Sequence, residues 1–438
     1  MIRWFYSALL YLTLPLVWLR LIHRGMAQPG YRQYRKERWG YYHPVSGTAP
    51  LIWIHAVSVG ETRAAEPLIG ALLSAYPQHN ILLTSMTPTG RATGAERFVE
   101  NPSFGARFPH RVRQAYLPYD YPDAVARFLK HFQPQIGLLM ETELWPNLMS
   151  ACARHQLPIL LVNARLSERS ARGYARFSAL TGAAFRQLRG VIAQTAADAE
   201  RLSTLGATVL GVSGNLKFDV QPDKALLDQG KTWRASFGER PVWLAASTRE
   251  GEENGLLAAH QTLLKEVPDA LLMLVPRHPQ RFQAIADQVI AAGLSMVRRS
   301  ESQPLQDTQV WLGDSMGEMP AYYACADIAV MGGSWMPLGG QNLIEATACA
   351  CPVLVGPHTF NFAQATEDAI AAGAACRLPD TEALPGTLLS LWSNPANQLA
   401  MQNAAAQFTA QHQGATQRTL EHIRHLFPVL PHAFPLGR

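Results

Sequence analysis

The chain has few cysteines, and short motifs that identify common enzyme classes are absent from it. Its five cysteines are scattered over 438 residues, with no Cys-x-x-Cys pair and no zinc-ligand spacing. This pattern favours free thiols in a reducing compartment over disulfides or a zinc site. The complete motif Gly-x-x-x-x-Gly-Lys-Ser/Thr does not occur, and no Asp-x-Asp pair is present. These absences disfavour P-loop NTPase chemistry and give no sign of a carboxylate-held metal ion.

Acidic side chains are scarce at the N-terminal end. Residues 1–50 hold seven of the 38 lysines and arginines but only one of the 33 acidic residues, so the net charge of +5 is concentrated there. The rest of the chain is close to neutral. A near-neutral body argues against a broad nucleic-acid surface and directs attention to the N-terminal segment.

That segment is predicted to attach the protein to a membrane. Residues 4–22 are apolar and aromatic, and they are about long enough to span a bilayer, although Pro15 would kink them. We expect a membrane anchor in residues 1–24 and a basic, aromatic juxtamembrane segment in residues 25–50. A signal peptide and a helix lying on the membrane surface are the alternatives.

The position of the basic residues gives an orientation. They follow the apolar run, which by the positive-inside rule places the rest of the chain on the cytoplasmic side. We expect four of them to contact anionic headgroups or a phosphorylated lipid: Arg32, Arg35, Lys36 and Arg38.

The remaining chain alternates between apolar strands and helical segments, which is the pattern of a parallel α/β sheet. Strands are expected at residues 51–54, 80–85, 135–140, 158–163, 190–195 and 209–213, and a short strand or turn at 115–120. After a polar stretch that contains Pro222, further strands are expected at 241–248, 270–275, 308–312, 327–331 and 352–357. A chain of this length is too long for one core, so we predict two α/β domains, 51–219 and 237–410, joined by a linker at 220–236.

Charged residues repeatedly follow the strands of the first domain. Glu61, Glu141, Glu143, Arg165 and Lys217 all come after strand ends, and such ends converge on one edge of a parallel sheet. Glu61 stands near the start of the helix that follows the first strand. It is open from the spacing alone whether Glu61 only caps that helix or acts as a general base.

A glycine-rich loop in the second domain suggests an anion-binding site. Residues 332–341 connect a strand to a helix, and glycines there let backbone N–H groups approach a phosphate. Asn342 and Glu345 fit a capping box, although Glu345 could also accept hydrogen bonds from a ribose. Arg277, at a neighbouring strand end, is a plausible phosphate donor.

Several longer motifs carry a family resemblance. They include His-Ala-Val-Ser-Val-Gly-Glu at 55–61, Met-Glu-Thr-Glu-Leu-Trp-Pro-Asn at 140–147 and Asn-Leu-Lys-Phe-Asp at 215–219. Further matching segments lie at 86–90, 117–120, 163–167, 276–279 and 356–362. In this order, over nearly the whole chain, they resemble the Kdo (3-deoxy-D-manno-oct-2-ulosonic acid) transferases of lipopolysaccharide biosynthesis, glycosyltransferase family 30.

The resemblance implies a fold and a reaction. The fold is GT-B: two Rossmann-like α/β domains facing across a cleft, with an N-terminal anchor helix and a C-terminal helix, 411–438, packing back on the first domain. The reaction is inverting, metal-independent transfer of Kdo from CMP-Kdo to the 6′-hydroxyl of the lipid A precursor at the cytoplasmic side of the inner membrane. No cofactor and no nucleic acid are implied.

The resemblance also assigns residues. Glu61 matches the general base, and Glu141 and Lys217 match residues that act around the transition state. The CMP-binding positions fall on Pro276, Arg277, Met316, Gly317, Glu318, Asn342, Leu343, Ile344 and Glu345.

Two positions depart from the family pattern. Gln341 and Leu343 stand where the family usually has His and Pro, so any charge of that His is missing here. Two other interpretations stay open: a transferase that uses another nucleotide sugar on a membrane lipid, and a non-catalytic lipid- or nucleotide-binding relative. Oligomeric state, acceptor acylation preference and the number of Kdo residues added are not readable from the sequence.

Overall fold

The computed structural model describes residues 2–44, 49–301 and 303–427, and the chain divides into two compact units. Unit 1 comprises residues 1–220 and 413–438, and unit 2 comprises residues 221–412. Each unit contains a sheet of seven strands in which every neighbouring pair is parallel. The prediction of two α/β domains with parallel sheets is therefore confirmed.

The sheet of unit 1 has the order β3-β2-β1-β4-β5-β6-β7, so its strand order reverses between β1 and β4. Ligands of open α/β sheets collect at the carboxyl ends of strands at such a reversal. The strands are β1 (Leu51–His55), β2 (Asn80–Ser85), β3 (Val112–Tyr116), β4 (Ile136–Met140), β5 (Ile159–Ala164), β6 (Gly190–Ala193) and β7 (Val209–Val212).

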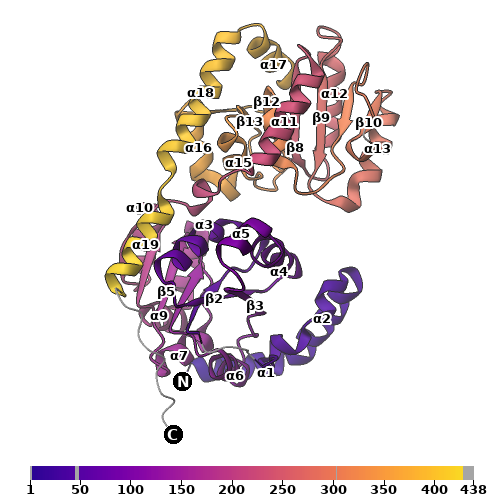
Figure 1. Cartoon of the computed structure of the whole chain (residues 1–438). Coiled ribbons are helices and arrows are strands. Elements are labelled where there is room, and N and C mark those ends of the chain that lie inside the picture. The colour runs from indigo at the N-terminus through magenta and orange to yellow at the C-terminus, as the bar shows by residue number, and fades with distance from the viewer. Residues whose placement is uncertain (1, 45–48, 302, 428–438) are drawn as a thin grey trace. The chain divides into compact units, whose positions relative to one another are not determined.

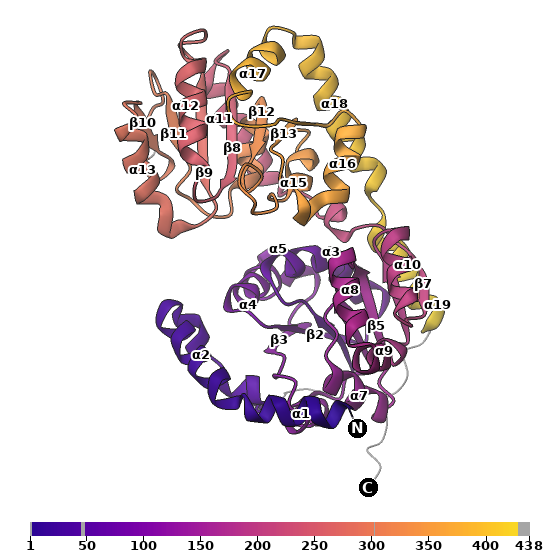
Figure 2. The same cartoon turned by 180° about the vertical axis from the view of Figure 1, so that it is seen from behind.

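Alternate residues of these strands supply two cores, because successive side chains of a strand point to opposite faces. Ile52 and Ile54 of β1 join one cluster, which also contains residues of α3 and α19. Leu51 and Trp53 join a second cluster with residues of α6 and α7. The continuous apolar runs of the sequence therefore reflect burial of the sheet on both faces (Figures 1 and 2).

The helices of unit 1 follow its strands (Figure 1). They are α3 (Val59–Ala75), α4 (Pro88–Gly94), α5 (Pro102–Arg107), α6 (Pro122–Phe132), α7 (Pro146–Arg154), α8 (Glu168–Arg176), α9 (Ser178–Arg186) and α10 (Ala196–Thr204), with α19 (Ala415–Leu426) added from the C-terminal end. Helix α19 packs on α3.

The N-terminal segment forms two helices instead of one. Helices α1 (Ile2–Leu12) and α2 (Leu14–Ala27) meet at an angle of 50°, with Pro15 in the first turn of α2. Within the described residues, neither helix alone has the length and apolar composition to cross a bilayer, whereas the bent pair together meets those two criteria. The membrane anchor stays a prediction.

The sheet of unit 2 has the order β10-β11-β9-β8-β12-β13-β14 and reverses between β8 and β12. Its strands are β8 (Val242–Thr248), β9 (Leu271–Pro276), β10 (Met296–Arg298), β11 (Val310–Leu312), β12 (Ile328–Met331), β13 (Val353–Val355) and β14 (Ala375–Arg377). Its helices are α11 (Lys224–Phe237), α12 (Glu253–Leu263), α13 (Phe282–Ala291), α14 (Met319–Cys325), α15 (Leu343–Ala348), α16 (Ala363–Ala371), α17 (Leu384–Trp392) and α18 (Pro395–His412).

The predicted linker at 220–236 is wrong for most of its length. Residues Lys224–Phe237 form helix α11, whose N-terminus is capped by the side chain of Asp223. Trp233 of α11 packs edge-on against Trp311, with a ring-centroid distance of 4.9 Å. Helix α11 belongs to unit 2 and is stabilised by packing within it, whereas the sequence pattern indicates a helix only for residues 231–237.

Candidate functional site

Glu61 lies in the first turn of α3, at the carboxyl end of β1. Its carboxylate accepts hydrogen bonds from the Val57 backbone N–H (2.8 Å) and from the Ser58 hydroxyl (2.9 Å). Glu61 therefore caps the helix, as one of its two interpretations requires. The residue is only 9% exposed, and burial together with the charge of Glu141 raises its pKa to about 7. A carboxylate with that pKa is also suited to take up a proton near neutral pH.

Glu141 and Glu143 follow β4, the strand beside β1 at the reversal of strand order. Glu141 pairs with Lys217, with 3.2 Å between Oε1 and Nζ. Burial raises the pKa of Glu143, which accepts a hydrogen bond from Trp145 Nε1 at 2.9 Å. The structure thus brings the three residues assigned around the reaction, Glu61, Glu141 and Lys217, to one edge of the sheet.

Lys217 is held in place from two sides. It lies on the 3-10 helix η4 (Leu216–Asp219). The side-chain oxygen of Asn163, a residue with φ of 51°, accepts a hydrogen bond from Leu216 N–H at 3.0 Å. Asp219 accepts a hydrogen bond from Gly414 N–H at 2.7 Å, which ties η4 to the start of α19. Asn163 and Asp219 therefore position the 3-10 helix that carries Lys217. The sequence pattern alone did not indicate this role.

The basic residues that follow helices α1 and α2 belong to unit 1. Arg32, Arg35 and Lys36 are exposed, but Arg38 is 1% exposed, so its placement at a membrane-facing surface was wrong. Its guanidinium lies 4.0 Å from the ring centre of Tyr116 and donates to the Met86 carbonyl. Stacking on aromatic rings of unit 1 stabilises this buried cation.

The glycine-rich loop of unit 2 is organised around Glu252, a residue that follows β8 and is 2% exposed. Its carboxylate accepts hydrogen bonds from three backbone N–H groups: those of Arg249 (2.8 Å), Gly333 (2.8 Å) and Trp335 (3.0 Å). Two of these donors belong to the loop after β12, across the reversal of strand order. Glu252 therefore fixes the loop to the neighbouring strand end.

The residues at the start of α15 differ in whether their side chains can reach a ligand. Asn342 caps the helix by accepting from the Ile344 N–H, and it donates to Glu345 at 3.2 Å. Leu343 and Ile344 are each 1% exposed, so their side chains belong to the core of unit 2. Any contact from these two residues to a nucleotide would come from their backbone.

The other predicted donor-binding residues lie on loops at the carboxyl ends of β9 and β11. Pro276 is buried at the end of β9, Arg277 is exposed, and Met316 and Gly317 are exposed. Glu318 accepts hydrogen bonds from Arg299 and Gln229, so its carboxylate already has protein partners.

Positive charge gathers beside these loops. Burial and the charges of Arg249, Arg277 and Arg281 lower the pKa of His278. Arg281 is paired with Glu253 through two hydrogen bonds of 2.7 and 2.9 Å. This edge of unit 2 therefore has an electrostatic character that suits an anion.

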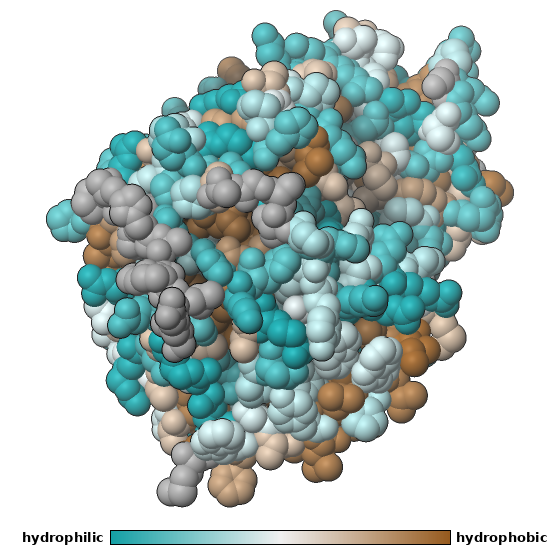
Figure 3. All heavy atoms as spheres, turned by 60° about the horizontal axis from the view of Figure 1, so that its bottom comes forward, coloured by the Kyte–Doolittle hydropathy of each residue, from teal (hydrophilic) through white to brown (hydrophobic). Residues whose placement is uncertain are grey.

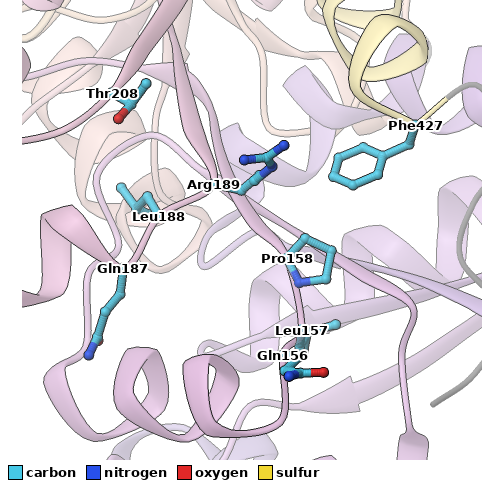
Figure 4. Close-up of a pocket in the computed structure, with 8 residues that line it drawn as sticks. All are labelled: Gln156, Leu157, Pro158, Gln187, Leu188, Arg189, Thr208 and Phe427. Atoms are coloured by element: carbon cyan, nitrogen blue, oxygen red, sulfur yellow. The ribbon is translucent and has the colours of Figure 1, made fainter.

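A cavity of about 490 Å³ lies elsewhere in unit 1, near the amino ends of β5, β6 and β7. Figure 4 shows Phe427, from the end of α19, pointing toward Arg189 there. None of the residues predicted for chemistry or donor binding lines it. The residues predicted for chemistry lie at the opposite edge of the sheet.

Two family models match the chain in its two halves. Residues 33–220 match a family described as 3-deoxy-D-manno-octulosonic-acid transferase, and residues 248–408 match the glycosyl transferases of group 1. Among solved structures, a putative UDP-N-acetylglucosamine 2-epimerase from Listeria monocytogenes is similar over 89% of this chain and all of its own. At 17% identity and a TM-score of 0.56, it shows the fold alone.

Two relatives described as Kdo transferases match over nearly the whole chain. A 3-deoxy-D-manno-octulosonic acid transferase of Bordetella pertussis is 47% identical over 93% of this chain and 95% of its own length. A transferase of the same description from Haemophilus influenzae is 37% identical over 96% of this chain and 98% of its own length. With this identity over this span, the chain belongs to the Kdo transferase family of glycosyltransferases.

Proposed function

We propose that the chain transfers Kdo from CMP-Kdo to the 6′-hydroxyl of the lipid A precursor, with inversion and without a metal or other cofactor. The observation that carries this proposal is Glu61, a buried carboxylate with a pKa of about 7 at the carboxyl edge of the unit 1 sheet. Membership of the Kdo transferase family supplies the sugar and the lipopolysaccharide context.

The proposed step moves one proton and exchanges one bond. Glu61 accepts the proton of the acceptor hydroxyl, whose oxygen forms a bond to C2 of Kdo. The bond from C2 to the phosphate oxygen of CMP breaks, and CMP leaves as an anion from the opposite face, which inverts the configuration. Lys217 forms an ion pair with Glu141, which fixes the position of its ammonium group. In the proposed reaction this cation faces Kdo, a sugar that carries a carboxylate.

Unit 2 is the proposed donor site. Arg249 and Arg277 lie near His278, beside the glycine-rich loop that Glu252 holds. Arginine side chains match phosphate geometry well, and CMP-Kdo carries a phosphodiester and a carboxylate. A negatively charged donor therefore fits the charge of this edge better than a neutral sugar does.

We further propose that α1 and α2 hold the protein on the cytoplasmic surface of the inner membrane without spanning it. One side of α1 is tied to the body: Tyr6 donates to Asp120, Ser7 to Asn147 and Tyr11 to Asp123. The outer side is apolar and exposed, with Trp4 at 74% and Leu12 at 78%. Figure 3 shows apolar side chains protruding on the face at the bottom of Figure 1. Such a helix suits the bilayer interface, where Arg32, Arg35 and Lys36 can meet anionic lipids.

The direct test is transfer from CMP-Kdo to a tetra-acylated lipid A precursor, with products resolved by mass. We expect one or more Kdo units to be added, and the masses count them. CMP should compete with the donor, and UDP should not. Competition by UDP would favour another nucleotide sugar. CMP binding without any product would favour a non-catalytic relative, and either result contradicts the proposal.

The charge pair beside Glu61 should set the pH dependence of the reaction. Because the charge of Glu141 raises the pKa of Glu61, Glu141→Gln should move the rise of kcat/KM with pH to lower pH. Lys217→Met leaves Glu141 without its partner and should move the rise to higher pH, besides lowering the rate. The measurement is kcat/KM from pH 5 to pH 9, and shifts in the same direction for both variants would contradict this assignment.

A further inference from the structure

A second cavity, of about 480 Å³, lies between the N-terminal helices and the α/β body of unit 1. Helix α2 lines it with Val17, Arg20, Leu21 and Arg24. These residues stand at positions i, i+3, i+4 and i+7, so they form one face of the helix. The cavity falls within the volume range of small-molecule sites, and nothing assigned above uses it.

The walls combine aromatic rings with arginine side chains. Tyr31, Tyr119, Tyr121 and Trp145 line the cavity together with the arginines of α2. Asp120 is the acidic residue among the lining residues, and its carboxylate already accepts hydrogen bonds from the Asn147 and Leu148 N–H groups and from Tyr6. Two arginines against one aspartate leave the lining residues with a net positive charge.

A third arginine stands behind the aromatic wall. Arg38 lies 5.5 Å from the ring centre of Tyr31 and 5.9 Å from that of Tyr119. Arg24 approaches Tyr31 as well, at 5.6 Å. Nε and Nη2 of Arg38 are buried and have no hydrogen-bond partner among the described residues. Arg38 is not among the lining residues, and its charge adds to the positive potential behind the aromatic wall.

The cavity and the catalytic edge share a loop. Trp145 lines the cavity and donates its indole N–H to Glu143 at 2.9 Å. The charge of Glu143 in turn contributes to the raised pKa of Glu61. Trp145 and the Glu143 to which it donates therefore connect the cavity with the carboxylates proposed for the reaction.

We infer that this cavity binds the acceptor lipid, with an acyl chain between the aromatic wall and α2 and a phosphate at Arg20 and Arg24. The inference rests on the proposed function in that the acceptor is a phosphorylated lipid. The apolar lining fits a hydrocarbon chain, and the uncompensated arginines fit a phosphate monoester. The N-terminal helices are then part of the acceptor site as well as a means of attachment to the membrane.

The test separates acylated from deacylated acceptor. Val17→Trp should fill the cavity, and Arg24→Gln should remove one phosphate contact while leaving the fold intact. We expect Val17→Trp to raise KM for the tetra-acylated acceptor at least tenfold and to change KM for the fully deacylated disaccharide phosphate little. Arg24→Gln should raise KM for both acceptors, because both carry phosphate. Ile290→Trp, at an exposed position of unit 2, is the matched control and should change neither.

Two further measurements keep the outcomes distinct. Calorimetric binding of each acceptor to the full chain, without donor, reports on the cavity even if no transfer occurs. Sedimentation with phosphatidylglycerol vesicles should be the same for Val17→Trp and wild type, which shows that membrane attachment is intact. Equal effects of Val17→Trp on both acceptors, or none on either, would overturn the inference. Failure of wild type to transfer to any acceptor would overturn the proposed function instead.

Discussion

Glu61→Gln should lower kcat by at least about two orders of magnitude, because the amide keeps the shape of the side chain but cannot accept the proton of the acceptor. The variant should bind CMP normally, since Glu61 lies in unit 1 and the proposed donor residues lie in unit 2. In wild type, kcat/KM should rise with pH and level off above about 7, the pKa that burial and Glu141 give to Glu61. The variant should lack that rise. Steady-state kinetics from pH 5 to pH 9 provide the measurement.

A stability measurement shows whether a loss of rate in Glu61→Gln comes from a loss of the fold. The pKa of Glu61 is about 7 in the folded protein and 4.5 ordinarily, so the folded state holds this proton more tightly than the unfolded chain. The free energy of unfolding therefore falls as pH rises from about 4.5 to about 7, by at most about 1.4 kcal/mol for each unit of pKa difference. Glutamine does not ionise. Glu61→Gln should therefore melt close to wild type at pH 5 and at a higher temperature at pH 8.

The two interpretations of Glu61 now differ in outcome. If Glu61 only caps α3, replacing it with glutamine should leave the rate near normal. If it is also the base, the variant should be folded and nearly inactive. Near-normal turnover would mean that the base is another residue.

The strands that carry the site were predictable because buried strands appear in the sequence as runs of consecutive apolar residues. β1 and β4 lie at the centre of their sheet, and both were expected within one residue of where they begin and end. β10 and β14 have three residues each and lie at the two edges of the other sheet. Ala-Cys-Arg in β14 carries no strand pattern, and pairing with β13 supplies its conformation.

The residues of the candidate site also differ in how clearly the sequence indicates them. Glu61, Glu141 and Lys217 follow recognisable strands and belong to long motifs, so the sequence could point to them. Arg38 sits in a stretch of basic and tyrosine residues that resembles a surface, and only the folded chain reveals its burial. Glu252 gave no signal, because its partners Gly333 and Trp335 lie 81 and 83 residues away in the sequence. Contacts of that range depend on topology and not on local pattern.

Glu252→Ala should loosen the glycine-rich loop and lower the affinity for CMP by at least tenfold, while kcat at saturating donor falls much less. The substitution leaves three backbone N–H groups without their acceptor, and each buried unsatisfied donor costs about 1–3 kcal/mol. Burial also raises the pKa of Glu252, so part of this cost is offset by removing a poorly solvated carboxylate. Three hydrogen bonds to an ionised acceptor outweigh that offset, and we expect a net loss of about 3 kcal/mol in the stability of unit 2.

The control for this prediction is Glu250→Ala, which removes the same charge from an exposed position two residues away and should leave stability and donor affinity unchanged. Glu252→Gln should be intermediate, because one amide oxygen remains to accept hydrogen bonds where the carboxylate has two. Denaturant unfolding and calorimetric CMP binding report the two effects separately. A folded Glu252→Ala protein with normal CMP affinity would show that the loop holds its shape without this carboxylate. An effect on donor KM together with an intact kcat identifies Glu252 as a residue that positions the donor loop, in contrast to Glu61, whose loss should appear in kcat.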